Sequence, residues 1–308
     1  EVAGPRHPRH LHRSRCTGAR TCRKEKALST LIVQHPALSP GAVREFSALA
    51  GHTPDVRGPA MALWRRVSIA SDALDDAANT HQVDAEIVAP DLRLGSFRLA
   101  AFDMDSTLIT IECIDEMADF AGCKAEVAAI TEAAMRGEIS DYDESLRRRV
   151  ALLAGLPVSV LQHVWDERVR LSPGAEALVR RMKACGLQLL LVSGGFSFFT
   201  DRLARRLGIQ HVRSNILEIR NGHLTGRLEG EIVNAQVKRQ ALQATAARIA
   251  CPLSQTIAVG DGANDLQMMS VAGLSVAYRA KPVVRNETTH AINHGGLDSM
   301  LRLFEDTR

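Results

Sequence analysis

The chain has 308 residues, of which 45% are apolar and 24% are charged, and its formal net charge is +3. This composition is ordinary for globular domains and provides enough apolar surface for two or three folded units. No apolar run approaches the eighteen or so residues that a membrane-spanning helix needs, so we expect a cytoplasmic protein without a membrane partner. The six cysteines have no paired spacing, which indicates reduced thiols rather than a disulfide framework.

The positive charge is concentrated in residues 1–27. This stretch has eight lysines and arginines against two glutamates, a local charge of +6, so the remaining residues sum to −3. It has almost no large apolar side chains and no periodicity, which predicts a disordered basic tail. Because the rest of the chain is slightly acidic, we expect no nucleic-acid partner.

Residues 28–95 alternate short strands with short helices and predict a small α/β module. The predicted strands lie at 31–33, 64–70 and 85–89, and the predicted helices at 40–50 and 72–79. Ser39 is a suitable N-cap for the first helix. The module has no cluster of catalytic side chains, and a regulatory role or a role in homodimer formation stays open for it.

The hexapeptide Phe102-Asp103-Met104-Asp105-Ser106-Thr107 follows a short apolar strand near the start of the main unit. Alternate residues of a strand point to the same face, so Asp103 and Asp105 share one site if the backbone stays extended. Two carboxylates so near each other favour a bound cation, or a pair in which one group acts as an acid and the other as a base. An Asp-rich turn that caps a helix is the alternative, and the hexapeptide alone does not decide between them.

The main unit continues as alternating strands and amphipathic helices. Strands are predicted at 187–192, 256–259 and 274–278, helices at 172–185, 197–207 and around Lys238, and a hairpin at 216–228 with its turn at Asn221-Gly222. This alternation predicts an α/β fold with a doubly wound parallel sheet. Its ligand site is expected at the carboxyl ends of the strands.

Polar side chains follow three of these strands. They are Asp103 and Asp105 after the first, Ser193 after the second, and Asp261 and Asp265 after the third. Several carboxylates in one crevice require a hard cation, and an all-oxygen ligand set selects Mg²⁺. Lys238 adds a positive charge, so one aspartate is predicted to form an aspartyl-phosphate while another protonates the leaving oxygen. The pattern therefore predicts phosphoryl transfer from a small-molecule substrate.

These segments resemble the haloacid dehalogenase-like (HAD) phosphohydrolases, and among them the phosphoserine phosphatases, over about residues 97–305. The matching stretches are FDMDSTLITIECIDE, SLRRRVALL, LVSGGFSFFTDRLA, NGHLTGRLEGEIV and AVGDGANDLQMM. The resemblance implies a HAD-like, Rossmann-type core at 96–113 and 172–308, with a helical cap at 114–171 inserted after the first strand. It also implies metal ligands at Asp103, Asp105 and Asp261, with Asp105 binding through its backbone carbonyl.

The same resemblance assigns the remaining roles. Asp103 is the implied nucleophile, Asp105 the general acid/base, and Ser193, Gly194 and Lys238 hold the phosphoryl group with Asn264 and Asp265 beside it. Glu112 and Arg149 match the glutamate and arginine that bind the ammonium and carboxylate of the substrate, and Met135 and Tyr142 would line an apolar wall. Runs of charge usually face solvent, so Arg147 and Arg148 remain alternatives to Arg149. Asn215 and Arg213 are interpreted as structural.

Three functions stay open at this point. The resemblance favours a Mg²⁺-dependent phosphatase that hydrolyses O-phospho-L-serine to L-serine and phosphate, the last step of L-serine biosynthesis. A second possibility is a phosphatase of the same superfamily that acts on another small phosphomonoester. The third is a non-enzymatic, receiver-like phospho-acceptor, but an acid/base two residues from the nucleophile would hasten hydrolysis of its phosphoaspartate.

Overall fold

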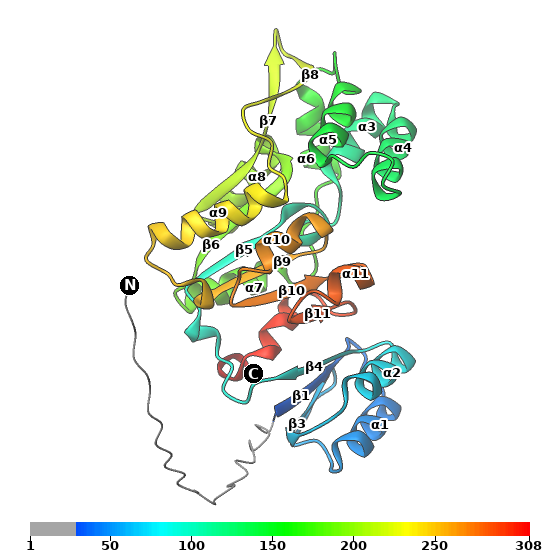
Figure 1. Cartoon of the computed structure of the whole chain (residues 1–308), viewed down its shortest axis with the longest axis vertical. Coiled ribbons are helices and arrows are strands. Elements are labelled where there is room, and N and C mark those ends of the chain that lie inside the picture. The colour runs from blue at the N-terminus through cyan, green and yellow to red at the C-terminus, as the bar shows by residue number, and fades with distance from the viewer. Residues whose placement is uncertain (1–28) are drawn as a thin grey trace, which may run out of the picture.

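The computed structural model describes residues 29–308 except the side chain of Met135, so the tail predicted at 1–27 lies outside the described residues. An N-terminal module, a core and a cap follow one another along the long axis of the molecule (Figure 1). Within residues 29–308, no helix has both the length and the apolar character needed to cross a bilayer.

The N-terminal module is an antiparallel sheet with two helices. Its elements are β1 (Ser29–Gln34), α1 (Pro40–Ala50), β2 (Val56–Arg57), β3 (Met61–Val67), α2 (Ser71–His81) and β4 (Asp84–Val88), in the sheet order β2-β3-β1-β4. The predicted helix at 40–50 is confirmed as α1, and the Ser39 hydroxyl accepts a hydrogen bond from the Ala42 amide at 3.1 Å. The strand predicted at 64–70 lies three residues earlier, and β2 was not predicted.

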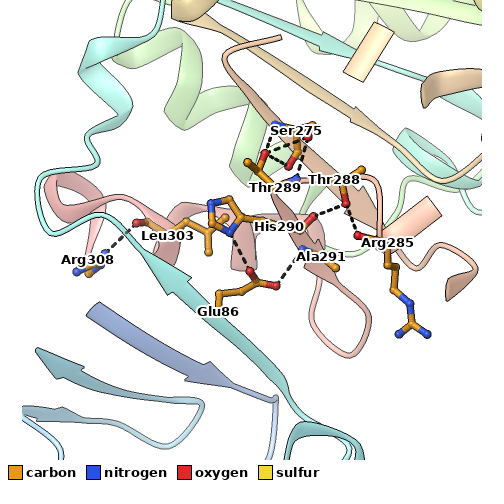
Figure 2. A network of polar contacts seen from close by, with 9 residues as sticks. All are labelled: Glu86, Ser275, Arg285, Thr288, Thr289, His290, Ala291, Leu303 and Arg308. Atoms are coloured by element: carbon orange, nitrogen blue, oxygen red, sulfur yellow. Dashed lines mark hydrogen bonds and ion pairs between the residues drawn. The ribbon is translucent and has the colours of Figure 1, made fainter. Parts of the chain in front are cut away.

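Strand β4 docks the module onto the core through two carboxylates, of which Asp84 is buried and Glu86 is partly buried. Asp84 is 2% exposed and accepts hydrogen bonds from three consecutive backbone amides, the first at 2.7 Å from Asn293. Glu86 pairs with His290 at 2.8 Å and accepts a hydrogen bond from the Ala291 amide at 2.9 Å (Figure 2). Alternate residues of a strand share a face, so β4 directs both acids toward one segment of the core, which is the strand at 290–292 and the loop that follows it.

The core is a seven-stranded sheet in the order β11-β10-β9-β5-β6-β7-β8, which confirms the predicted doubly wound parallel sheet. Its strands are β5 (Leu99–Phe102), β6 (Gln188–Phe196), β7 (His211–Arg220), β8 (His223–Glu229), β9 (Thr256–Gly260), β10 (Leu274–Tyr278) and β11 (His290–Ile292). Its helices are α7 (Ala175–Ala184), α8 (Ser197–Leu207), α9 (Ala235–Arg248), α10 (Leu266–Met269) and α11 (Pro282–Arg285). Strand β8 runs antiparallel to β7, and the other neighbouring strands of this sheet are parallel. All residues of the central strands β5 and β9 are buried, which explains their continuous apolar sequences.

Two boundaries of core elements differ from the prediction. The helix expected from 172 begins at Ala175, and its N-cap is Gly174 with φ +78°. Strand β6 does not stop at Val192 but continues to Phe196. Val192 pairs with Arg213 and Phe196 with Asn215, so four steps along β6 oppose two along β7. This bulge displaces Ser193-Gly194-Gly195, hereafter the glycine turn, from the regular ladder.

The cap consists of α3 (Cys113–Ala121), α4 (Lys124–Met135), α5 (Tyr142–Ala151) and α6 (Ser159–Glu167), and it covers one end of the core (Figure 1). The chain enters and leaves it through adjacent antiparallel segments. Ile109 bridges Leu171, and the Thr110 amide donates to the Arg170 carbonyl at 3.0 Å. The two connections between cap and core are therefore paired with each other.

Candidate active site

The backbone changes direction directly after β5. Asp103 and Asp105 both have extended φ and ψ angles, but Met104 between them belongs to a helical turn, and Ser106 has φ +53°. The continuous extended backbone therefore ends at Asp103. The Asp103 carboxylate accepts a hydrogen bond from the Met104 amide at 2.7 Å, and that of Asp105 accepts one from the Cys113 amide at 3.2 Å. Cys113 is the first residue of α3, so Asp105 lies at the positive end of a helix.

Lys238 is fully buried between two carboxylates. Its Nζ lies 2.8 Å from Oδ2 of Asp103 and 2.7 Å from Oδ1 of Asp265. Burial alone would lower the pKa of Lys238, but the charges of Asp103 and Asp265 raise it above its usual value, so the side chain is cationic. Asp265 is itself fully buried and also accepts a hydrogen bond from the Gly262 amide at 3.1 Å. It therefore holds Lys238 in place, a contact that its sequence position did not reveal.

The carboxylates form a crowded acidic group. Asp103, Asp261 and Asp265 each offer an oxygen within 4.8 Å of the others. Burial and the neighbouring charge of Asp103 raise the pKa of Asp261 to about 8 and that of Asp105 to about 7. Like charges at such separations are costly without a cation, and an all-oxygen donor set fits a hard divalent metal ion. The residues present therefore suit a metal, although the carboxylate of Asp105 is not in this group.

Thr107 supports the acidic group and was missed by the sequence reasoning. Its hydroxyl donates a hydrogen bond to Oδ1 of Asp261 at 2.9 Å, and its side chain is fully buried. This contact fixes one orientation of the Asp261 carboxylate. Its place in the acidic hexapeptide was the signal that could have identified it.

The glycine turn presents a hydroxyl next to these carboxylates. Ser193 Oγ accepts a hydrogen bond from the Gly195 amide at 2.9 Å, which leaves the hydroxyl proton available to donate. Asn215 donates to the Gly194 carbonyl at 2.7 Å and accepts from the Val233 amide at 2.8 Å. Asn215 thus contacts backbone, as its structural interpretation predicts. Its amide gives the Gly194 carbonyl a hydrogen-bond partner at the bulge, where the regular pairing of β6 with β7 is interrupted.

Asn264 and Arg213, which the sequence analysis also considered, lie in different surroundings. Asn264 is half-buried in the turn after β9, and its amide oxygen lies only 2.2 Å from where a Cβ on Gly262 would be. Arg213 instead pairs with Glu231 at 2.7 Å on the surface, in agreement with its structural interpretation.

The cap contributes Glu112 and Tyr142 to the same region. The Ser106 hydroxyl donates to Glu112 at 2.7 Å. Desolvation by the surrounding residues and the charge of Asp105 raise the pKa of Glu112 to about 8, although its side chain keeps access to solvent. The Tyr142 hydroxyl lies against Gly194, only 2.3 Å from the position that a Cβ there would take. The side chain of Met135, the other predicted wall residue, lies outside what the structure describes.

The three arginines of α5 differ in exposure. Arg147 and Arg148 have side chains that are 56% and 55% exposed and pair with acidic residues one turn earlier. Arg149 is half-buried, and its positive charge lowers the pKa of Tyr142, whose net shift is upward because of burial. Arg149 is therefore the arginine of this run whose charge acts on the face next to the glycine turn.

Comparisons with known proteins agree with this architecture. The family model described as haloacid dehalogenase-like hydrolase matches residues 100–270. A phosphoserine phosphatase of a Polaromonas species is 59% identical over 223 residues, which are 71% of this chain and 94% of that protein. A solved structure of a probable phosphoserine phosphatase from Vibrio cholerae, unliganded, has a TM-score of 0.77 and 34% identity, over 92% of this chain and 87% of that one.

A substrate-bound phosphoserine phosphatase complex has a TM-score of 0.64 and 36% identity, and the match covers 68% of this chain and 99% of that one. The sequence match, the shared topology and the acidic strand ends all lead to the same assignment. The chain belongs to the haloacid dehalogenase-like hydrolases.

Proposed function

We propose that the chain hydrolyses O-phospho-L-serine to L-serine and phosphate through an aspartyl-phosphate on Asp103. The main observation behind this proposal is the position of Asp103, which directly follows β5. Its carboxylate lies 2.8 Å from Nζ of the fully buried Lys238. Relatives named phosphoserine phosphatase, at up to 59% identity among those above, support the substrate. The reaction would yield L-serine, the product of serine biosynthesis.

The residues divide the reaction into two displacements. Asp103 attacks phosphorus, so an Asp103–phosphorus bond forms and the bond from phosphorus to the serine oxygen breaks. Asp105 gives that oxygen its proton and then takes one from the water that hydrolyses the acyl phosphate. Lys238 and the Ser193 hydroxyl stabilise the charge that develops on the phosphoryl oxygens.

We further propose that Mg²⁺ is the metal of this site. Asp103, Asp261 and the backbone carbonyl of Asp105 would hold it. When bound, the ion supplies positive charge that neutralises phosphoryl oxygens. The structural reason to expect it is that three carboxylates crowd this site, whereas the Lys238 ammonium pairs with two of them, Asp103 and Asp265.

Gly195 is expected to tolerate no side chain. A Cβ at this position would lie 2.6 Å from Oδ2 of Asp105 and 2.7 Å from Cε of Met104, closer than real contacts allow. Gly195→Ala should therefore push the acid/base away from the reacting atoms and lower kcat by about 100-fold. Steady-state phosphate release measures this change.

Gly41→Ala is the matched control, because a Cβ there meets no atom closer than 3.6 Å, and it should keep the wild-type kcat. A Gly195→Ala enzyme with wild-type kcat would contradict the close packing around Asp105.

Specificity for an amino-acid phosphate should reside in Glu112 and Arg149. An ammonium group needs an anion, and a carboxylate fits the bidentate guanidinium fork. Glu112→Gln and Arg149→Ala should each lower kcat/KM for phosphoserine by about 100-fold. Turnover of p-nitrophenyl phosphate, which carries neither group, should change by less than about threefold.

Arg148→Ala is the control for this pair, because Arg148 is exposed and forms a salt bridge with Glu144 on the same helix. It should leave the kcat/KM for both substrates unchanged. Equal losses on both substrates in the Glu112 and Arg149 variants would argue for a different phosphomonoester as the substrate.

A further inference from the structure

Asn234 lies where the cap meets the helix that carries Lys238. It is the N-cap residue of α9, and its Oδ1 accepts a hydrogen bond from the Val237 amide at 3.1 Å. Its Nδ2 donates to Oδ1 of Asp143, in the first turn of cap helix α5, at 3.0 Å. The Lys238 amide donates to the Asn234 carbonyl at 2.9 Å, so Lys238 closes the first turn that Asn234 begins.

The choice of asparagine at this N-cap is informative. An N-cap needs only a side-chain acceptor, which serine, threonine and aspartate supply about as well as asparagine. Within residues 29–308, the NH2 group of the Asn234 side chain donates only to Asp143 of the cap. Because one planar group makes both bonds, its orientation at the start of α9 is tied to the position of Asp143.

The residues next to this contact lie on the glycine turn. Tyr142, which precedes Asp143, has its hydroxyl against Gly194. The backbone amide of Val233, which precedes Asn234, donates a hydrogen bond to the Asn215 side chain, and the same side chain donates to the Gly194 carbonyl. The start of α5, the glycine turn and the start of α9 thus form one hydrogen-bonded and packed unit.

We propose that Asn234 is a positioning residue that makes the placement of Lys238 depend on the docking of the cap. With the cap docked, Asp143 holds the Asn234 amide in its capping orientation, and α9 presents Lys238 to Asp103. When the cap lifts, this bond opens and the first turn of α9 loses a restraint. The charge-neutralising lysine is therefore fully placed only when the cap covers the substrate. This inference rests on the proposed phosphatase function.

Exchange of donor and acceptor tests the contact. Asn234→Asp keeps the capping acceptor and the side-chain shape but turns a carboxylate toward Asp143, so kcat should fall by about 30-fold with KM changed by less than about threefold. Asp143→Asn still offers an amide oxygen to Asn234 and should stay within about twofold of wild type. The double variant restores one hydrogen bond with its polarity reversed, and its kcat should return to within about threefold of wild type.

A second readout does not depend on activity. Hydrogen exchange of the amides in 233–238 and in the first turn of α5 should accelerate at least tenfold in Asn234→Asp and return to wild-type rates in the double variant. Asn234→Ser keeps a capping oxygen but is too short to reach Asp143, so it should also lower kcat and accelerate exchange. This variant tests the proposal if Asn234→Asp does not fold.

Wild-type kcat in Asn234→Asp and Asn234→Ser would overturn the proposal, and so would a double variant as impaired as Asn234→Asp. Failure of the wild-type chain to hydrolyse phosphoserine would instead refute the proposed function. In that case the exchange rates alone would support or overturn the coupling between cap and α9.

Discussion

Asp103→Asn should abolish hydrolysis of phosphoserine, with a rate at least about 10⁴-fold below wild type. An amide oxygen is a poor nucleophile, and the substitution also removes the charge that pairs with Lys238 at 2.8 Å. The side chain keeps its shape and can still accept the Met104 amide, so the fold should persist. Phosphate release at saturating substrate, together with a thermal melt, measures both expectations.

The matching control is Asp91→Asn, which changes an exposed aspartate outside the site and should leave the rate unaltered. A folded Asp103→Asn variant that keeps more than about a hundredth of the wild-type rate would show that Asp103 is not the nucleophile. A rate restored only slowly, over hours, would point to deamidation of the introduced asparagine, and mass spectrometry of the protein would reveal it.

Lys238→Met should lose both activity and stability. The buried ammonium pairs with Asp103 and Asp265 at 2.8 and 2.7 Å, and methionine fills a similar volume without the charge. The two buried carboxylates would then keep their backbone hydrogen bonds but lose the cation between them, which costs about 3–5 kcal/mol in the free energy of unfolding. Activity should fall by about 10³-fold or more, since charge stabilisation in the transition state is lost. Urea unfolding and phosphate release test the two losses separately.

The double variant Lys238→Met/Asp265→Asn provides the control for the stability loss. It removes one of the two unpaired charges and should recover part of the lost stability while staying inactive. A single Lys238→Met variant as stable as wild type would contradict the charged arrangement of these three side chains.

The elements with clear local signals were predictable. Helix α1 was predicted at its observed bounds because Ser39 is a suitable N-cap, and in the structure Gly51 ends the helix with φ +77°. The hairpin of β7 and β8 was predicted from the Asn221-Gly222 pair, and in the structure both residues adopt the positive φ that such a turn requires. Strand β6 ran past its predicted end because the bulge at the glycine turn keeps an extended backbone where the apolar run has stopped.

The functional site was also predictable only in part. The positions of Asp103 and Asp261 directly after their strands follow from the topology, since carboxyl ends of parallel strands meet at one edge of the sheet. Ser193 lies at the same edge, in the bulge near the carboxyl end of β6. The contacts that hold those residues did not follow. Asn215 reaches backbone 18 and 21 residues away, and Asn234 reaches a cap residue 91 positions earlier. Such hydrogen bonds depend on tertiary distances that no local pattern encodes.

The most direct test of the account is phosphate release by the purified chain from a panel of small phosphomonoesters, with Mg²⁺ and with the metal removed by a chelator. We expect O-phospho-L-serine to be hydrolysed with a kcat/KM at least about 100-fold above that for phosphomonoesters without an amino-acid group, and only with the metal present. Equal rates across the panel, or full activity after metal removal, would contradict it.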